Sequence, residues 1–143
     1  MGHDLVIRGG RVVDGTGAPA ATADVAIDDG RVTAVGRVTE PGQREIDADG
    51  ALVTPGWVDV HSHYDGQATW DPLLAPSSWH GVSTILFGNC GVGFAPVRPG
   101  SQQGLVELME AVEEIPGIAM LEGMKFNWES FPDYLDALEG MQR

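Results

Sequence analysis

The stretch PGWVDVHSH, residues 55–63, decides how the rest of this chain is interpreted. A proline–glycine pair breaks the preceding structure, and a short apolar run then leads to His61 and His63. In a β-strand, side chains two residues apart project from the same face. The two imidazoles would then lie side by side, with Val58 and Val60 packed on the opposite face. Such a pair either binds one metal ion, at Zn–N distances of about 2.0–2.1 Å, or consists of two partly exposed histidines without a ligand.

Composition narrows the range of partners. The chain has 143 residues, 43% of them hydrophobic, which is enough for a core of ordinary domain size. Eight Lys and Arg against 21 Asp and Glu give a formal net charge of −13. Binding to nucleic acid requires clustered cations, and an anionic membrane repels an acidic protein. We therefore expect neither nucleic acid nor a membrane as a partner.

The chain contains a single cysteine, Cys90, so it cannot form an internal disulfide. A lone cysteine fits a reducing compartment, where the thiol is a ligand, a nucleophile or an inert core residue. The sequence begins without a basic and then apolar leader, and no apolar run approaches the roughly 18 residues of a membrane-spanning helix. We expect a soluble, cytoplasmic protein.

Residues 1–54 have the composition of a small all-β unit. Apolar segments at 5–13 and 25–35 each contain a glycine turn in the middle, and the two segments align with each other without gaps. This pattern predicts two similar strand–turn–strand hairpins in one antiparallel sheet. Further strand material follows at 45–53. No catalytic group is evident in this part of the chain.

Residues 55–143 instead alternate strand and helix patterns. Strands are expected at 57–61 and 82–87, one helix after Ser101 that ends at Pro116-Gly117, and another helix after Ser130. The apolar stripes expected on the two helices are Leu105, Leu108, Met109 and Val112 on the first, and Phe131, Tyr134, Leu135 and Leu138 on the second. Strand followed by helix, repeated, implies parallel strands with helices outside.

The expected fold class is therefore α/β, with residues 55–143 as the first strands and helices of a (β/α)8 barrel. A complete barrel takes about 250 residues, and two parallel strands alone leave raw edges. The sequence is interpreted as the N-terminal part of a longer protein.

The chemistry-bearing residues fall where such a barrel places its functional groups, at the carboxyl ends of strands. His61 and His63 end the first strand, and Cys90 directly follows the second. Neighbouring strands lie about 4.8 Å apart, so their ends can share a metal site. A thiolate beside one or two Zn²⁺ ions would be deprotonated and could bridge them. Cys90 as a buried structural thiol or as a nucleophile are the alternatives, and the glycines around it favour a site loop.

Three further residues are weaker candidates. Asp59 shares the face of the histidines, where its carboxylate either supports a His N–H from the second shell or bonds to neighbouring backbone. Tyr64 and Asp65 follow the histidines in a loop, where they either contact substrate or are solvated or cap a turn.

These residues resemble the opening of an amidohydrolase-superfamily enzyme, through segments 50–56 and 59–63. Within that superfamily the segment 88–96, GNCGVGFAP, resembles the N-acyl-D-amino-acid deacylases (D-aminoacylases) in particular. The stretches 61–67 and 114–131 are similar to the same branch, so the resemblance covers nearly the whole chain. The Asn-Cys-Gly segment is its most specific part.

The resemblance implies a ligand set and a reaction. His61 and His63 match a metal-binding pair, and Cys90 matches the cysteine that ligates zinc in this branch, with one or two Zn²⁺ ions as cofactor. Two further histidines and a catalytic aspartate would come from downstream, so this chain alone would be inactive. The implied reaction hydrolyses the amide bond of a small-molecule N-acyl-D-amino acid, giving a carboxylate and a D-amino acid.

The same resemblance implies the partners within the enzyme. Residues 1–54 would be the N-terminal part of a small β-sandwich domain, completed by the remainder of the enzyme as a C-terminal segment or a second chain. Two alternatives remain open. One is a cyclic-amide hydrolase related to hydantoinases and dihydroorotases, which the Cys90 loop disfavours because those enzymes generally use a carboxylated lysine. The other is a non-catalytic fragment or binding module that retains only the fold.

Overall fold

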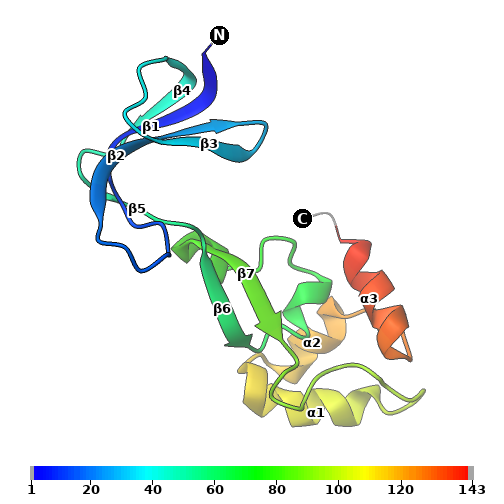
Figure 1. The fold of residues 1–143 in the computed structure, drawn as a ribbon. Coiled ribbons are helices and arrows are strands. Elements are labelled where there is room, and N and C mark those ends of the chain that lie inside the picture. Colours follow the sequence, from blue (N-terminus) through cyan, green and yellow to red (C-terminus); the bar gives the residue numbers. More distant parts are fainter. Residues whose placement is uncertain (1, 142–143) are drawn as a thin grey trace. The chain divides into compact units, whose positions relative to one another are not determined.

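The computed structural model describes residues 2–141. The chain divides into two compact units, Met1–Pro55 and Gly56–Arg143. The first is built from β-strands, and the second combines two strands with helices (Figure 1).

The first unit is one five-stranded sheet with the order β3-β2-β1-β4 and with β5 also paired to β1. Its strands are β1 (His3–Val12), β2 (Ala21–Asp28), β3 (Arg31–Gly36), β4 (Gly42–Asp47) and β5 (Leu52–Val53). Val6, Ala26 and Val38 form its small buried cluster. Both β4 and β5 run parallel to β1, so the sheet is mixed and the expectation of an antiparallel sheet is wrong.

Only the second of the two predicted hairpins is present. β2 and β3 pair antiparallel across a turn at Asp29 and Gly30, both with positive φ. The first predicted hairpin is wrong, because β1 continues through Gly9 and Gly10 as a single ten-residue strand. The pairing with β2 shifts register between Ile7 and Gly10, which is the mark of a β-bulge. The glycines therefore serve a bulge and not a turn.

The second unit contains a pair of parallel strands, β6 (Trp57–Ser62) and β7 (Val82–Phe87), as the alternating pattern predicts. Their arrowheads point to the same end of the pair (Figure 1). Two 3₁₀ turns, η1 (Gln67–Thr69) and η2 (Ser77–His80), lie in the connection between them.

Three helices follow the strand pair: α1 (Gln102–Glu113), α2 (Gly117–Gly123) and α3 (Phe131–Glu139). The sequence did not predict α2. Pro116 is its N-cap, so the proline begins a helix as well as following one. At α3 the predicted start is confirmed by a capping box, in which Ser130 and Asp133 each accept the other's backbone N–H.

The core of the second unit lies between its helices and loops. Its buried members are Phe94, Val97, Val106, Met109, Met120, Met124, Trp128 and Tyr134. The predicted stripes are wrong at Leu108, Phe131 and Leu135, which are 55%, 53% and 44% exposed. The buried face of each helix is rotated toward the aromatic loop residues, so Val106 is buried in place of Leu108.

Val58 and Val60 are also exposed, contrary to the expectation that they pack beneath the strand. Within residues 2–141 these two side chains stay 56% and 64% exposed. None of the helices in the described part of the chain is both long enough and apolar enough to cross a bilayer.

Candidate metal centre

The two histidines lie at the carboxyl end of β6, on either side of a serine that anchors the strand end. Ser62 is buried, and its hydroxyl donates a hydrogen bond of 3.0 Å to the carbonyl of Leu86 in β7. His61 and His63 therefore project from the opposite face to Ser62, and their ring centroids are 5.5 Å apart. The alternation of a strand places both imidazoles together, as their spacing predicts.

Cys90 lies in the turn that follows β7. Gly88 and Gly91 on either side of it have φ angles of +78° and +87°, which a residue with a Cβ rarely adopts. The side-chain amide of Asn89 donates to the carbonyl of Val60 at 2.9 Å. This bond attaches the turn to β6 one residue before His61, so the exposed Cys90 thiol lies beside the histidine pair.

The three predicted ligands meet in space. One ligand atom from each of His61, His63 and Cys90 lies within 4.8 Å of the others. Sγ of Cys90 is 3.7 Å from Nδ1 of His63. Tetrahedral zinc with ordinary Zn–N and Zn–S bond lengths holds such a nitrogen–sulfur pair about 3.6 Å apart. Two imidazoles and a thiolate are donors that suit zinc, so these residues fit a zinc ion.

Two acidic side chains lie behind this cluster. Asp65 is 4% exposed, and its Oδ2 has no hydrogen-bond partner within residues 2–141. Burial raises the pKa of Asp65, although the backbone N–H groups of Asp65 and Gly88 and the His63 ring oppose the rise. Glu113 on α1 accepts the N–H of Gly66 at 2.9 Å.

Burial is also the main cause that raises the pKa of Glu113 to about 7. The N–H of Gly66 opposes this rise, and the nearby charge of Asp65 adds to it. Glu113 thus exchanges a proton near neutral pH, unlike an ordinary glutamate.

The weaker candidates occupy definite positions. Oδ1 of Asp59 accepts the backbone N–H of His61 at 3.1 Å, which is the bond to neighbouring backbone named above as one of its two expected roles. The Tyr64 hydroxyl donates to Ser77 at 2.8 Å. Asp65 lines a cavity of about 190 Å³ together with glycines of the Cys90 turn. A bond from Asp59 to an imidazole, and substrate contacts of Tyr64 and Asp65, stay predictions.

Glu113 and Asn89 are the residues near the site that the sequence analysis missed. Glu113 follows Val106 by seven residues and Met109 by four, which puts a carboxylate on the buried face of α1. That pattern was present in the sequence. The contact of Asn89 with Val60 depends on the strand register and gives no sequence signal.

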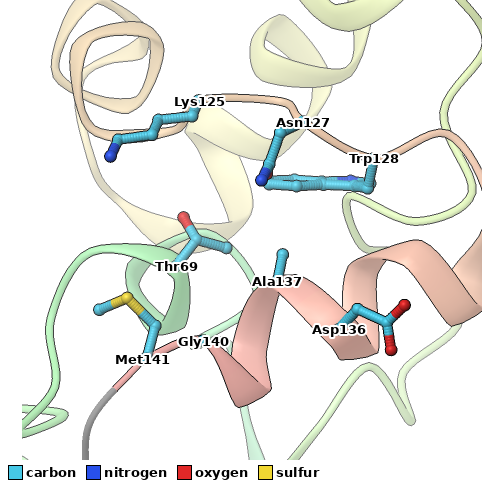
Figure 2. A pocket seen from close by; sticks show the side chains of 8 residues that line it. All are labelled: Thr69, Lys125, Asn127, Trp128, Asp136, Ala137, Gly140 and Met141. Carbon is cyan, nitrogen blue, oxygen red and sulfur yellow. The ribbon is translucent and has the colours of Figure 1, made fainter.

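A separate cavity of about 260 Å³ lies between the segment 125–128, η1 and α3. Figure 2 shows its lining side chains, with Thr69 and Ala137 facing Asn127 and Trp128. It contains none of the predicted ligands.

Comparisons with known proteins identify the relatives of this chain. The chain is 39% identical over 136 residues to the N-acyl-D-aspartate deacylase of Alcaligenes xylosoxydans xylosoxydans. The matched region is 94% of this chain and 25% of that protein. The crystal structure of the N-acyl-D-glutamate deacylase from Bordetella bronchiseptica, complexed with zinc and a phosphonate inhibitor, superposes with a TM-score of 0.74. It is 34% identical and is matched over 99% of this chain and 28% of its own.

A D-aminoacylase structure, described for its binuclear metal centre, has a TM-score of 0.72 and 34% identity over 95% of this chain and 27% of its own. The chain thus spans about a quarter of the length of these proteins. The resemblance to N-acyl-D-amino-acid deacylases is confirmed, and so is the α/β fold class. A profile of the amidohydrolase family matches residues 44–142, which is more than half of the chain, and the protein therefore belongs to the amidohydrolase family.

Proposed function

We propose that this chain is the N-terminal part of a zinc-dependent enzyme that hydrolyses the amide bond of N-acyl-D-amino acids. The observation that carries the proposal is the convergence of His61, His63 and Cys90 within 4.8 Å. The three similar proteins described above are D-amino-acid deacylases by name, and one of them was crystallised with zinc. The complete enzyme would act in the cytoplasm on a small-molecule substrate.

His61, His63 and Cys90 would hold the ion, with Cys90 as a thiolate. Zinc, when bound, lowers the pKa of a coordinated water toward about 7 and polarises a carbonyl oxygen. Within this chain, Ser62 and Asn89 keep the strand end and the Cys90 turn together, so the three donors are presented from a fixed frame. Further ligands and a catalytic aspartate would come from outside the 143 residues.

The first unit would be part of a small β-sandwich in the complete enzyme, and the second the start of a (β/α)8 barrel. Support comes from apolar side chains without cover in the described part of the chain. Val32, Val35 and Leu52 are 62%, 56% and 66% exposed. The remainder of the enzyme, as a C-terminal segment or second chain, would bury such surface.

Zinc content measured by elemental analysis tests the proposal. The 143-residue chain is compared alone and after reassembly with the C-terminal portion, beside His61→Ala and Cys90→Ala. Zinc in the reassembled protein that is lost in both variants supports a shared site. Zinc unchanged in Cys90→Ala removes the branch-specific ligand, and no zinc in any sample overturns the metal mechanism.

Activity then identifies the substrate class. The reassembled protein is assayed with N-acetyl-D-amino acids, their L enantiomers, and hydantoin as a cyclic amide. Release of free D-amino acid supports the proposal. Hydrolysis of hydantoin alone contradicts it and favours the cyclic-amide alternative.

A further inference from the structure

Glu113 is an acidic residue on the core side of α1. Burying a carboxylate is unfavourable unless a hydrogen bond compensates for lost water. Here Oε1 accepts the N–H of Gly66, from a segment 47 residues earlier in the chain, at 2.9 Å. Oε2 is buried and has no hydrogen-bond partner within the described residues. The bond to Gly66 is therefore the main polar contact that compensates for burying the Glu113 carboxylate.

The contact is close enough to require glycine. A Cβ at position 66 would lie 2.9 Å from Oε2 of Glu113 and 3.0 Å from Cε2 of Phe94. Real Cβ atoms rarely approach other atoms so closely, so any side chain at 66 would displace the Glu113 carboxylate and the Phe94 ring. Glu113 and Gly66 together form a tight joint between α1 and the segment 64–67.

The segment 64–67 links the histidine pair to the Cys90 turn through side-chain contacts. It begins directly after His63, and its Asp65 lies beneath the glycines around Cys90. A Cβ at Gly93 would lie 2.7 Å from Oδ1 of Asp65. The hydroxyl of Tyr134 on α3 donates to the carbonyl of Asp65 at 2.7 Å. A displacement of the segment would therefore move His63 and the Cys90 turn relative to each other.

We infer that Glu113 is a positioning residue of the metal centre, which fixes His63 against Cys90 by holding the N–H of Gly66. The inference rests on the proposed function, because it requires that His61, His63 and Cys90 bind a metal. Groups that orient metal ligands typically change metal affinity by 10–100-fold when they are lost. Glu113 does not contact the ion or the substrate in this role.

The test compares Glu113→Met with Glu113→Gln in the complete protein. Both side chains fill the space and remove the buried charge, so folding is preserved in each, but only glutamine can accept the N–H of Gly66. Glu110→Ala is the matched control. Glu110 also accepts a glycine N–H, that of Gly117 at 3.1 Å, one turn earlier on the same helix and toward α2.

Zinc affinity is measured by competition with a chromophoric chelator. Co²⁺ substitution reports on Cys90, through the thiolate-to-cobalt charge-transfer band. Glu113→Met is expected to bind zinc about 10-fold or more weakly and to lose intensity in the thiolate band. Glu113→Gln should remain within about threefold of the wild type, and Glu110→Ala should be unchanged, because neither loses a bond to the segment 64–67.

Two outcomes overturn the inference: wild-type affinity and an unchanged band in Glu113→Met, or equal loss in Glu113→Gln and Glu113→Met. Failure of the proposed function is distinguishable from both. In that case the wild-type protein binds neither Zn²⁺ nor Co²⁺, and His61→Ala changes nothing.

Discussion

Nδ1 of His63 and Sγ of Cys90 lie 3.7 Å apart although 27 residues separate them in the sequence. One follows β6 and the other follows β7, and the two strands are paired in parallel register up to Ser62 and Phe87. Parallel pairing brings both carboxyl ends to one edge, so the contact is a consequence of the sheet. This relationship allows one ion to be shared by two segments.

Zinc should protect Cys90 from alkylation. The thiol is exposed, and only the free thiolate reacts with iodoacetamide. At a free zinc concentration ten times the dissociation constant, about a tenth of the sites remain empty and the rate should fall about tenfold. Mass spectrometry of the modified protein gives the rates. In His63→Ala the protection should be lost at the same zinc concentration, and equal rates with and without zinc in the wild type would contradict a Cys90 ligand.

Stability should fall as the pH rises through neutrality because of Glu113. Its pKa in the folded state is about 7, against 4.5 as the ordinary value. Between these values the folded protein retains a proton that the unfolded chain releases, so the stabilising contribution is complete below about pH 4.5 and is lost as the pH rises through about 7. The shift corresponds to about 3 kcal/mol, and partial exposure reduces it to about 1–2 kcal/mol.

Urea unfolding of the wild type and Glu113→Gln at pH 5.5 and pH 8 measures this effect. Glu113→Gln should lose most of the decrease between the two pH values. Burial also raises the pKa of Asp65, so this group changes stability with pH in the same direction. The same decrease in both proteins would show that Glu113 does not titrate in this range.

The positions of the predicted ligands could be derived from local patterns. His61 and His63 follow from the period of a strand, and Cys90 follows from the rule that neighbouring parallel strands end at one edge. These inferences needed only the apolar runs that predict the two strands and the positions at which those runs end. The capping box at Ser130 was equally local.

Other features were decided by tertiary contacts. Gly9 and Gly10 carry the composition of a turn, but β1 pairs with β2, β4 and β5 and continues past them as one strand with a bulge, at which Gly9 has a φ of +62°. Leu108 lies on an apolar stripe but faces outward, because the aromatic core contacts the side of α1 that bears Val106. Sequence periodicity shows that a helix has an apolar face, but it does not show which part of the protein packs against that face.

Gly93→Ala should destabilise the protein by about 1–3 kcal/mol, as expected for overpacking against a buried side chain. The new methyl group would lie 2.7 Å from Oδ1 of Asp65, which is buried. Gly104→Ala is the matched control, since no atom lies within 4 Å of its Cβ position on helix α1. That change should stabilise by about 0.5–1 kcal/mol through helix propensity. Thermal unfolding of both variants measures the difference, and a neutral Gly93→Ala would mean that Asp65 can move.

Asn89→Ala should weaken zinc binding by about 10-fold without unfolding the protein. The amide of Asn89 donates to the carbonyl of Val60 at 2.9 Å and is the side-chain bond that attaches the Cys90 turn to β6. Without it, the thiol samples positions farther from the histidines, and ordering it on binding costs affinity. Asn127→Ala is the control, because Asn127 lines the separate cavity of Figure 2 and should leave zinc affinity unchanged. Chelator competition compares the two variants, and equal affinities would indicate that the glycine-rich turn is held in place by its backbone alone.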